Sequence, residues 1–361
     1  MSDSVVKEST TTPRLILRSY RPSDHEQVDF IFYSTYFALV PEGVKQKLRS
    51  PLFWICWITV YGYLLAIIPI LLSGMSVPSW TGRVLQVFMT IAWGLVSFAG
   101  MFVMTDRLDV IDRIEQVRQN DLRDPEVYYM NVVKEEKIVI EEEEDTSKDQ
   151  QKKKRVTFDK DTKPATEIVR TPKPKDQQTK SHFWVLQMDN QICGMVGLAQ
   201  YKDIQYDQRP PLPPGWIKIG QLLCERYGVT PPSFLQFNPP TNIFAQPHAP
   251  HTATLQRLAV KQEFQGCGLA SILVNRVMSW AHQQGITQVF AVTNEMQSVA
   301  ADILRKHHQF TKVKSERKGW LGQTETTWVC HVEQWYDQHA AQADTFAKDT
   351  TPTTSSSEAS G

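Results

Sequence analysis

The most constraining feature of this chain is an apolar strand pattern that runs into a turn with two glycines and then directly into a helix pattern. Residues 258–270 read Leu-Ala-Val-Lys-Gln-Glu-Phe-Gln-Gly-Cys-Gly-Leu-Ala. The first N–H groups of a helix have no acceptor within the helix, and the helix dipole adds positive potential there, so such a start binds anions. Gly266 and Gly268 let the backbone approach a phosphate because they carry no Cβ. On its own, the pattern is also typical of an ordinary tight turn between a strand and a helix.

The residues that follow favour the anion site, because they continue as helix, strand, helix and strand. A helical stripe of apolar residues follows Ala270 and stops at Gly285. Residues 289–292 are a short apolar run that fits a buried strand. A second amphipathic segment ends at Phe310, and residues 326–332 predict another strand.

Three more strands are predicted earlier in the chain. Residues 15–18 form a short apolar run before a helix pattern, and residues 182–188 and 192–200 are two further strand patterns. Asp189-Asn190, between the last two, is a turn pair typical of a β-hairpin. Together with the later strands, these segments predict one sheet flanked by helices.

In this order of strands and helices, Gln265-x-x-Gly268-x-Ala270 resembles the acetyl-CoA pyrophosphate loop of the GNAT acetyltransferase superfamily. The resemblance implies an α/β fold with a mixed central sheet flanked by helices, and acetyl-CoA as the co-substrate. In the superfamily, the fourth strand pairs with the pantetheine arm and the loop holds the pyrophosphate. The cofactor-binding residues that the resemblance implies here are Leu258, Val260, Gln265, Gly266, Cys267, Gly268, Leu269, Ala270 and Ser271.

Two long stretches, Phe53 to Met75 and Val84 to Met104, contain no charged residue. Each is long enough to cross ~30 Å of hydrocarbon at about 1.5 Å per residue. Two buried helices of a large globular fold are the alternative, although such helices normally show a polar face. The short link at 76–83 predicts a transmembrane hairpin with both ends on one side. More basic residues lie outside the hairpin than in its link, so the positive-inside rule predicts a cytosolic domain. The link contains Arg83, whereas the flanking segments contain Lys45, Lys47, Arg49, Arg107 and Arg113.

A hairpin placed between the first helix and the second strand resembles the membrane-anchored branch of the superfamily, which includes cysteine-conjugate N-acetyltransferases and N-acetylaspartate synthase. The resemblance covers roughly residues 14–115, 182–202 and 252–333. It implies an N-acetyltransferase of an internal membrane, such as the endoplasmic reticulum. Its acceptor would be a primary amine of a small or amphiphilic molecule, whose identity the sequence does not fix.

The domain organisation expected from these patterns is one acetyltransferase domain interrupted by insertions. Residues 134–180 are rich in Lys, Glu, Gln and Thr, and such a composition buries too little apolar surface to fold. The basic cluster at 152–155 is too short to indicate nucleic acid, although it could touch anionic lipid. We expect a disordered N-terminus (1–13), the first strand and helix (14–48), the hairpin (53–104), a helical return (105–133), a disordered linker (134–180), the core (181–335) with a proline-rich insertion (203–250), and a disordered tail (338–361).

The linker contains Arg155-Val156-Thr157-Phe158, which resembles the docking peptide of type-1 protein phosphatase. Such a peptide adds a strand to a sheet edge and buries two apolar side chains. It suggests an alternative function, a non-catalytic GNAT-like membrane scaffold that binds this phosphatase. A solvated linker with incidental apolar residues explains the same four residues.

The insertion at 203–250 borders the acceptor side of the active site in this superfamily. Two interpretations fit its aromatic residues: a lid or acceptor pocket over the site, and a surface loop that packs its own side chains. These residues are Trp216, Tyr227, Phe234 and Phe237.

The sequence departs from the superfamily where the last core helix usually ends Tyr-x-x-x-Gly-Phe. Counting back from Phe310 places Arg305 at the position of the Tyr that protonates the thiolate. Arginine is no acid at neutral pH, although it could stabilise a thiolate electrostatically. His307 or His308 could replace the acid, and the alternative is that both are exposed residues at a helix end.

We therefore assign no catalytic residue from the sequence. Glu295 and Gln256 lie near the ends of the two central strands and are positions to test. No metal is expected, because the cysteines form no C-x-x-C pair and the histidine pairs lack a carboxylate partner at ligand spacing.

Overall fold

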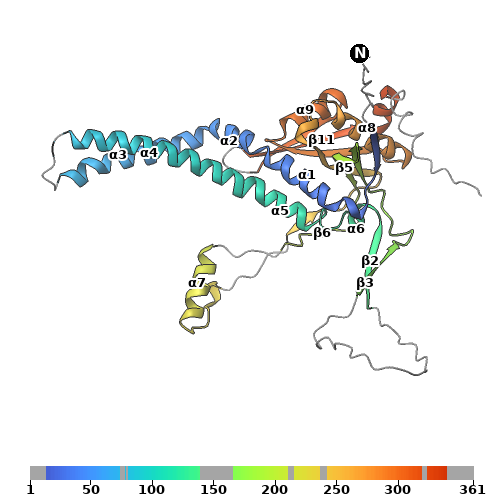
Figure 1. The fold of residues 1–361 in the computed structure, drawn as a ribbon, viewed down its shortest axis with the longest axis horizontal. Helices are drawn as coiled ribbons and strands as arrows, with labels where there is room; N and C mark the ends of the chain where they lie inside the picture. Colours follow the sequence, from blue (N-terminus) through green and yellow to red (C-terminus); the bar gives the residue numbers. More distant parts are fainter. Residues whose placement is uncertain are drawn as a thin grey trace, which may run out of the picture.

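A seven-stranded mixed sheet forms the centre of the molecule (Figure 1), and its strands lie in the order β1-β4-β5-β8-β9-β11-β10. The computed structural model describes residues 14–73, 78, 80–138, 166–209, 215–235, 242–318 and 323–339. β8 and β9 are parallel, and the other neighbouring strands are antiparallel. This confirms the expected α/β class with a mixed sheet. The strands are β1 (Leu15–Ser19), β4 (His182–Met188), β5 (Gln191–Ala199), β8 (Thr252–Val260), β9 (Gln288–Asn294), β10 (Thr311–Arg317) and β11 (Thr324–His331).

Helices cover both faces of the sheet, because its central strands are apolar on both sides. Trp184 and Leu186 of β4 pack with α8 (Leu269–Gln283) and with Leu304 of α9 (Ser298–His307). Their neighbours Phe183 and Val185 point to the other face. There they pack with α1 (His25–Phe37), α5 (Asp112–Gln119) and α6 (Pro125–Tyr129).

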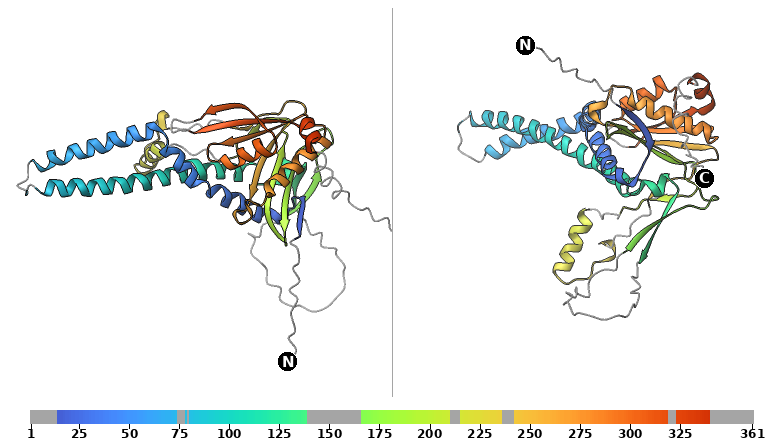
Figure 2. Two further views of the ribbon diagram at one scale, coloured as in Figure 1. Left: turned by 90° about the horizontal axis from the view of Figure 1, so that it is seen from above. Right: turned by 45° about the vertical axis from the view of Figure 1, so that its right-hand side comes forward.

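Two long helices, α3 (Pro51–Leu72) and α4 (Thr81–Met104), run side by side and project away from the sheet (Figures 1 and 2). Both are long and apolar enough to cross a membrane, and few of their side chains are buried. They contact each other through the rings of Trp57 and Trp93, and the hydroxyls of Tyr61 and Thr90 are 2.8 Å apart.

The hairpin joins the domain through a buried polar cluster. α2 (Val40–Leu48) precedes α3, and a π-helical segment, η2 (Thr105–Ile111), joins α4 to α5 without a break. Lys47 Nζ lies 2.5 Å from Asp109 Oδ2 and donates to Thr105 Oγ1 at 3.1 Å. Gln323 Nε2 donates to Asp109 Oδ1 at 2.6 Å. Thus the base of the hairpin is fixed to the residue just before β11.

The segment 134–180 forms strands at both of its ends, which corrects the expectation that all of it is disordered. β2 (Val132–Ile138) and β3 (Thr166–Pro172) pair as an antiparallel ribbon. Lys134 of β2 lies 2.6 Å from Asp124 and 2.9 Å from Glu126, so paired charges and backbone hydrogen bonds order a segment that has little apolar surface. Residues 139–165, which contain the phosphatase-like motif Arg155–Phe158, lie outside the described residues.

Two further differences concern strands. β10, between Phe310 and residue 326, is a strand that the sequence patterns do not predict, because nearly all its side chains are exposed and polar. The insertion 203–250 contains a small ribbon of β6 (Gln205–Tyr206) and β7 (Ile243–Ala245), with α7 (Gly215–Arg226) and a 3-10 turn, η3 (Ser233–Leu235), between them. Residues 1–13 and 340–361 lie outside the described residues.

Candidate active site

The candidate site is a cleft where the two parallel central strands separate. β8 and β9 pair over only four residues each, from Thr252 to Leu255 and from Gln288 to Ala291. Beyond this pairing a cleft of about 520 Å³ opens, lined by residues 254–258 of β8 and 291–294 of β9. α9 adds Gln297, Ala300 and Leu304, while α1, α5 and β7 supply further lining residues.

A bulge in β8 marks the position at which the strands separate. The register between β5 and β8 shifts between Met195 and Gly197, so two residues of β8 face one residue of β5. Arg257, at this shift, has a φ of 54°, in the left-handed region that side-chain-bearing residues seldom occupy. A bulge bends its strand, which explains why β8 turns away from β9 here.

A buried carboxylate holds Arg257 in this conformation. Arg257 Nε donates to Asp121 Oδ2 at 2.6 Å, and Nη2 donates to Oδ1 at 2.9 Å, so the contact is bidentate. Burial alone would lower the pKa of Arg257, but the charge of Asp121, the neighbouring Tyr129 and the hydrogen bond to Asp121 together outweigh burial, and the net shift is upward. Asp121 is fully buried and also accepts a hydrogen bond from Tyr129. The ion pair therefore anchors the bulge from beneath the cleft.

Gln256 is the polar residue that this anchor presents to the cleft. Its Oε1 lies 3.1 Å from the hydroxyl of Tyr129 and 3.4 Å from that of Tyr201. Burial, together with the charge of Asp121, raises the pKa of both tyrosines, so both are neutral at physiological pH. Tyr129 donates its one proton to Asp121, so Tyr201 is the donor to Gln256. Of the positions that the sequence marked for testing, Gln256 thus lines the cleft.

The glycine turn connects the end of β8 to the start of α8. Gly266 and Gly268 have φ values of 82° and 78°, and a Cβ at either position would meet nothing within 4 Å. Gly268 is the N-cap residue of α8, and the side chain of Gln265 donates to the carbonyl of Val260 at 2.9 Å. An open, exposed helix start therefore lies directly after the strand that lines the cleft.

The residues expected to bind acetyl-CoA divide into two groups by burial. Leu258 lines the cleft, whereas the side chains of Val260 and Leu269 belong to the apolar core. Only their backbone groups are available to a ligand. The rest form the open loop and first turn, exposed or half-buried: Gln265, Gly266, Cys267, Gly268, Ala270 and Ser271.

The residues at and near the superfamily's acid position, and Glu295, do not line the cleft. Arg305 is 58% exposed and binds Asp302 at 3.0 Å, so Leu304, not Arg305, faces the cleft. His308 is buried beside Trp335, which contradicts the alternative of an exposed helix end, and burial lowers its pKa to about 4. Glu295 accepts a hydrogen bond from the backbone of Thr324 at 2.9 Å. In the described part of the chain, no three His, Cys, Asp or Glu side chains form a metal-binding group.

The insertion reaches the cleft through residues that the sequence did not mark. Phe244 and Ala245 of β7 line the cleft, whereas Tyr227 and Phe234 are exposed and do not. The side chains of Trp216 and Phe237 lie outside the described residues. Of the two alternatives for the insertion, Tyr227 and Phe234 therefore fit a surface loop better than an acceptor pocket.

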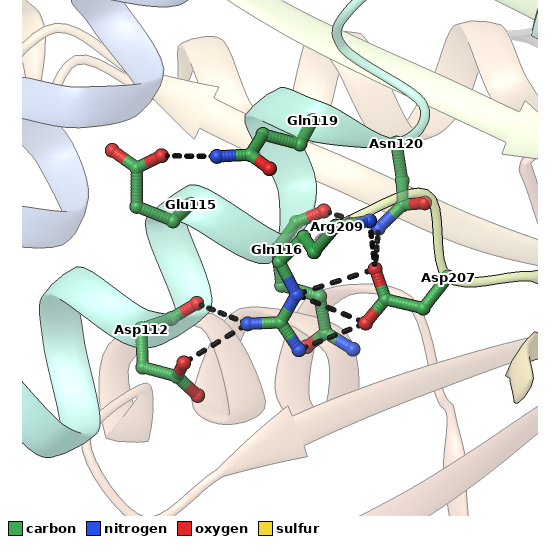
Figure 3. Close-up of polar contacts among 7 residues, drawn as sticks. All are labelled: Asp112, Glu115, Gln116, Gln119, Asn120, Asp207 and Arg209. Atoms are coloured by element: carbon green, nitrogen blue, oxygen red, sulfur yellow. Dashed lines mark hydrogen bonds and ion pairs between the residues drawn. The ribbon is translucent and has the colours of Figure 1, made fainter. Parts of the chain in front are cut away.

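A polar latch docks the insertion onto α5 (Figure 3). Arg209 Nη1 donates to Asp112 Oδ1 at 2.9 Å, and Arg209 Nε donates to Asp207 Oδ2 at 2.9 Å. Asn120 Nδ2 donates to Asp207 Oδ1 at 2.8 Å. Burial alone would raise the pKa of Asp207, but the hydrogen bonds from Arg209 and Asn120 lower it, and the net shift is downward. Two adjacent residues directly after α5 thus hold separate parts of the site. Asn120 binds the insertion through Asp207, and Asp121 binds the β8 bulge through Arg257.

Replacing Arg209 by alanine should loosen this latch. The buried carboxylate of Asp207 would lose its charged partner, a change that costs about 1–3 kcal/mol. We expect faster amide hydrogen exchange in residues 205–209 and 242–245. Arg305→Ala, which removes an exposed ion pair, is the matched control and should leave exchange there unchanged. Equal exchange in the Arg209 variant and the wild type would contradict the latch.

Comparisons with known proteins agree with this geometry. Residues 155–308 match the model of the acetyltransferase (GNAT) family. The matched region, which is less than half of the chain, is therefore similar to a GNAT acetyltransferase domain, and enzymes of that family use acetyl-CoA as the co-substrate. A search of curated proteins finds no match.

The solved structures that match include the following acetyltransferases, each at low identity. A GNAT-family acetyltransferase from Staphylococcus aureus Mu50 is 8% identical, with a TM-score of 0.36, over 88% of this chain and 99% of that one. A protein of Bacillus anthracis str. Ames described as a streptothricin acetyltransferase, in complex with acetyl coenzyme A, is 11% identical (TM-score 0.27; 47% of this chain, 77% of that one). The ribosomal-protein-S18-alanine N-acetyltransferase of Escherichia coli is 12% identical (TM-score 0.27; 45% and 79%).

Proposed function

We propose that this protein is a membrane-tethered N-acetyltransferase, which transfers the acetyl group of acetyl-CoA to a primary amine of a small or amphiphilic acceptor. One observation carries the proposal: the open helix start and the cleft are consecutive parts of one strand-turn-helix unit. The side chain of Gln265 ties the turn to the carbonyl of Val260, and Leu258 lines the cleft two residues earlier. A long ligand with an anionic end and a neutral arm fits such a surface.

In this proposal the turn binds the pyrophosphate and β8 binds the pantetheine arm. The N–H groups at the start of α8 face a loop with no Cβ at Gly266 or Gly268, so a phosphate can approach closely. The edge of β8 that does not pair with β9 offers its backbone groups to the amides of the arm. We assign these contacts to the backbone of Leu258 and Val260 and to residues 265–271.

The rate enhancement in this proposal comes from alignment and from fixed dipoles. A bulge leaves one residue of its strand outside the regular ladder, so the backbone near Arg257 has polar groups free to polarise the thioester carbonyl. The cleft then holds the amine near that carbon, which removes most of the entropic barrier. Two carboxylates line the cleft, and each is paired: Asp112 with Arg209 at 2.9 Å and Glu325 with Lys318 at 3.5 Å. We assign neither the role of general base.

The membrane tether is supported by the shape and charge of the hairpin. α3 and α4 project from the domain. Exposed Lys45 and Arg49 precede α3 in the chain, and exposed Arg107 follows α4. With Arg83 alone at the far end, the positive-inside rule favours a cytosolic domain. An internal membrane such as the endoplasmic reticulum remains part of the proposal.

The chemistry is tested by acetyl transfer from radiolabelled acetyl-CoA with the full chain in detergent. Acceptors would include a cysteine S-conjugate, aspartate and a long-chain alkylamine, each beside an analogue in which hydroxyl replaces the amine. We expect label in amides of one or more amines and none in the hydroxyl analogues, because the amine is the stronger nucleophile. Label confined to esters would contradict the proposed N-acetylation.

One observation favours a second candidate, a non-catalytic membrane scaffold. α9 presents Leu304 to the cleft, and neither Arg305 nor His308 reaches the position of an acid. In this case the chain would bind acetyl-CoA without turnover and capture type-1 protein phosphatase through Val156 and Phe158. A pull-down that is lost in a V156A/F158A variant, together with no transfer to any amine, would favour the scaffold.

A further inference from the structure

Helix α7 in the insertion carries an apolar face whose side chains are largely exposed in the described part of the chain. Its residues follow one another at helical spacing and continue into the turn after the helix, and their side chains are 52–75% exposed: Ile219, Leu222, Leu223 and Tyr227. Monomeric proteins seldom leave large apolar side chains clustered in this way, so such a face marks an interaction surface.

The opposite face of α7 is already occupied by its own insertion. Ile217 is buried, and a Cβ at Gly220 would lie 2.7 Å from Leu235 Cδ2, so η3 packs tightly against this side. Gln221 Nε2 donates to the carbonyl of Leu235 at 2.8 Å. The helix is therefore amphipathic: its inner face packs against η3, and its outer face stays largely exposed in the described part of the chain.

The position of α7 indicates what covers that face. In Figure 1, α7 lies level with the end of the hairpin nearest the sheet, and its axis runs across the hairpin axis. Figure 2 places α7 at the same level along the hairpin in both further views. This end of the hairpin is also the one flanked by exposed cations in the chain, with Lys45 and Arg49 before α3 and Arg107 after α4. A bilayer spanned by α3 and α4 would place its headgroups at this level.

We propose that α7 is an interfacial helix that lies on the membrane surface nearest the domain. Its apolar face enters the region between headgroups and acyl chains, while exposed Lys218 and Arg226 lie among anionic headgroups. The inference rests on the membrane tether of the proposed function. It adds a second contact with the bilayer, which fixes the orientation of the insertion that supplies Phe244 to the cleft.

The size of the face favours a bilayer over a protein partner. A stable protein interface buries about 800 Å² on each partner, from roughly 20 residues, and four side chains fall short of this. A helix held beside the membrane by a tether needs only a weak affinity, because the tether makes the second contact intramolecular. A lid over the cleft is the less favoured occupant, since Phe244 and not α7 lines the cleft.

The test uses the full chain reconstituted into vesicles of phosphatidylcholine and phosphatidylserine that contain a photo-crosslinking phospholipid. Mass spectrometry then maps the lipid adducts. We expect adducts on residues 219–227 as well as on the hairpin. An L222D/L223D variant should lose roughly ten-fold or more of the α7 adducts and keep those of the hairpin. Val313→Asp, at an exposed apolar residue of β10, is the matched control and should change neither.

The outcomes separate this inference from the tether on which it rests. Hairpin adducts without α7 adducts would overturn the interfacial helix and leave the tether in place. The absence of both sets would overturn the tether and the inference together. Protein–protein crosslinks through α7 that rise with protein concentration would assign the face to a second copy, and α7 protection caused by acetyl-CoA without lipid adducts would assign it to a lid.

Discussion

Acetyl-CoA binding should weaken at least about 100-fold when Gly268 is replaced by glutamate, a loss of about 2.7 kcal/mol. Gly268 has a φ of 78°, and forcing another residue into the left-handed region costs about 1–2 kcal/mol. The new carboxylate would also stand at the helix start where the pyrophosphate binds. A Cβ at Gly268 meets nothing within 4 Å, so the fold should survive, and equilibrium binding of labelled acetyl-CoA measures the loss.

Two controls separate strain from charge in this experiment. Gly268→Ala keeps the backbone strain without the charge and should weaken binding only several-fold. Gln283→Glu adds the same charge at the other end of α8 and should leave binding unchanged. Binding by the Gly268→Glu variant within three-fold of wild type, on the order of 0.6 kcal/mol, would contradict a pyrophosphate site at this turn.

The second large effect is expected from Asp121→Asn, which removes the charge that anchors the β8 bulge. Arg257 would keep a buried guanidinium without its carboxylate, and breaking a buried ion pair in this way costs about 3–5 kcal/mol. The midpoint of thermal unfolding in detergent should fall by roughly 10 °C. Turnover should fall as well, because the bulge that positions Gln256 and opens the cleft loses its support.

Matched variants make this second prediction specific. Asp29→Asn breaks a bidentate but partly exposed pair with Arg118 and should cost about 1 kcal/mol or less. A double variant, D121L/R257M, removes both buried charges and should regain much of the stability without regaining turnover. If D121N and D29N lowered the unfolding midpoint equally, the pair would have no special role beneath the cleft.

The parts of the site that are local in sequence were predictable. The positive φ values of Gly266 and Gly268 follow from a turn between a strand and a helix, and both glycines were identified from the sequence. The turn at Asp189-Asn190 has positive φ at both residues, as expected for a two-residue hairpin. The two apolar helices were likewise visible because their composition alone indicates them.

The parts that depend on distant residues were not predictable. Asp121 and Arg257 are 136 positions apart, and Arg209 and Asp112 are 97 apart, so no spacing rule connects them. β10 has no apolar alternation because it is an exposed edge strand. His308 is next to an exposed His307, and only the packing of Trp335 against the sheet decides that it is buried.

The most direct test of the central claim is amide hydrogen exchange of the full chain in detergent with and without saturating acetyl-CoA. We predict slower exchange in residues 265–272, at the turn and the start of α8, and in residues 256–260 of β8. β1, at the far edge of the sheet, should exchange at the same rate in both states. Saturable acetyl-CoA binding that protects neither segment, or no binding by folded protein, would contradict the account.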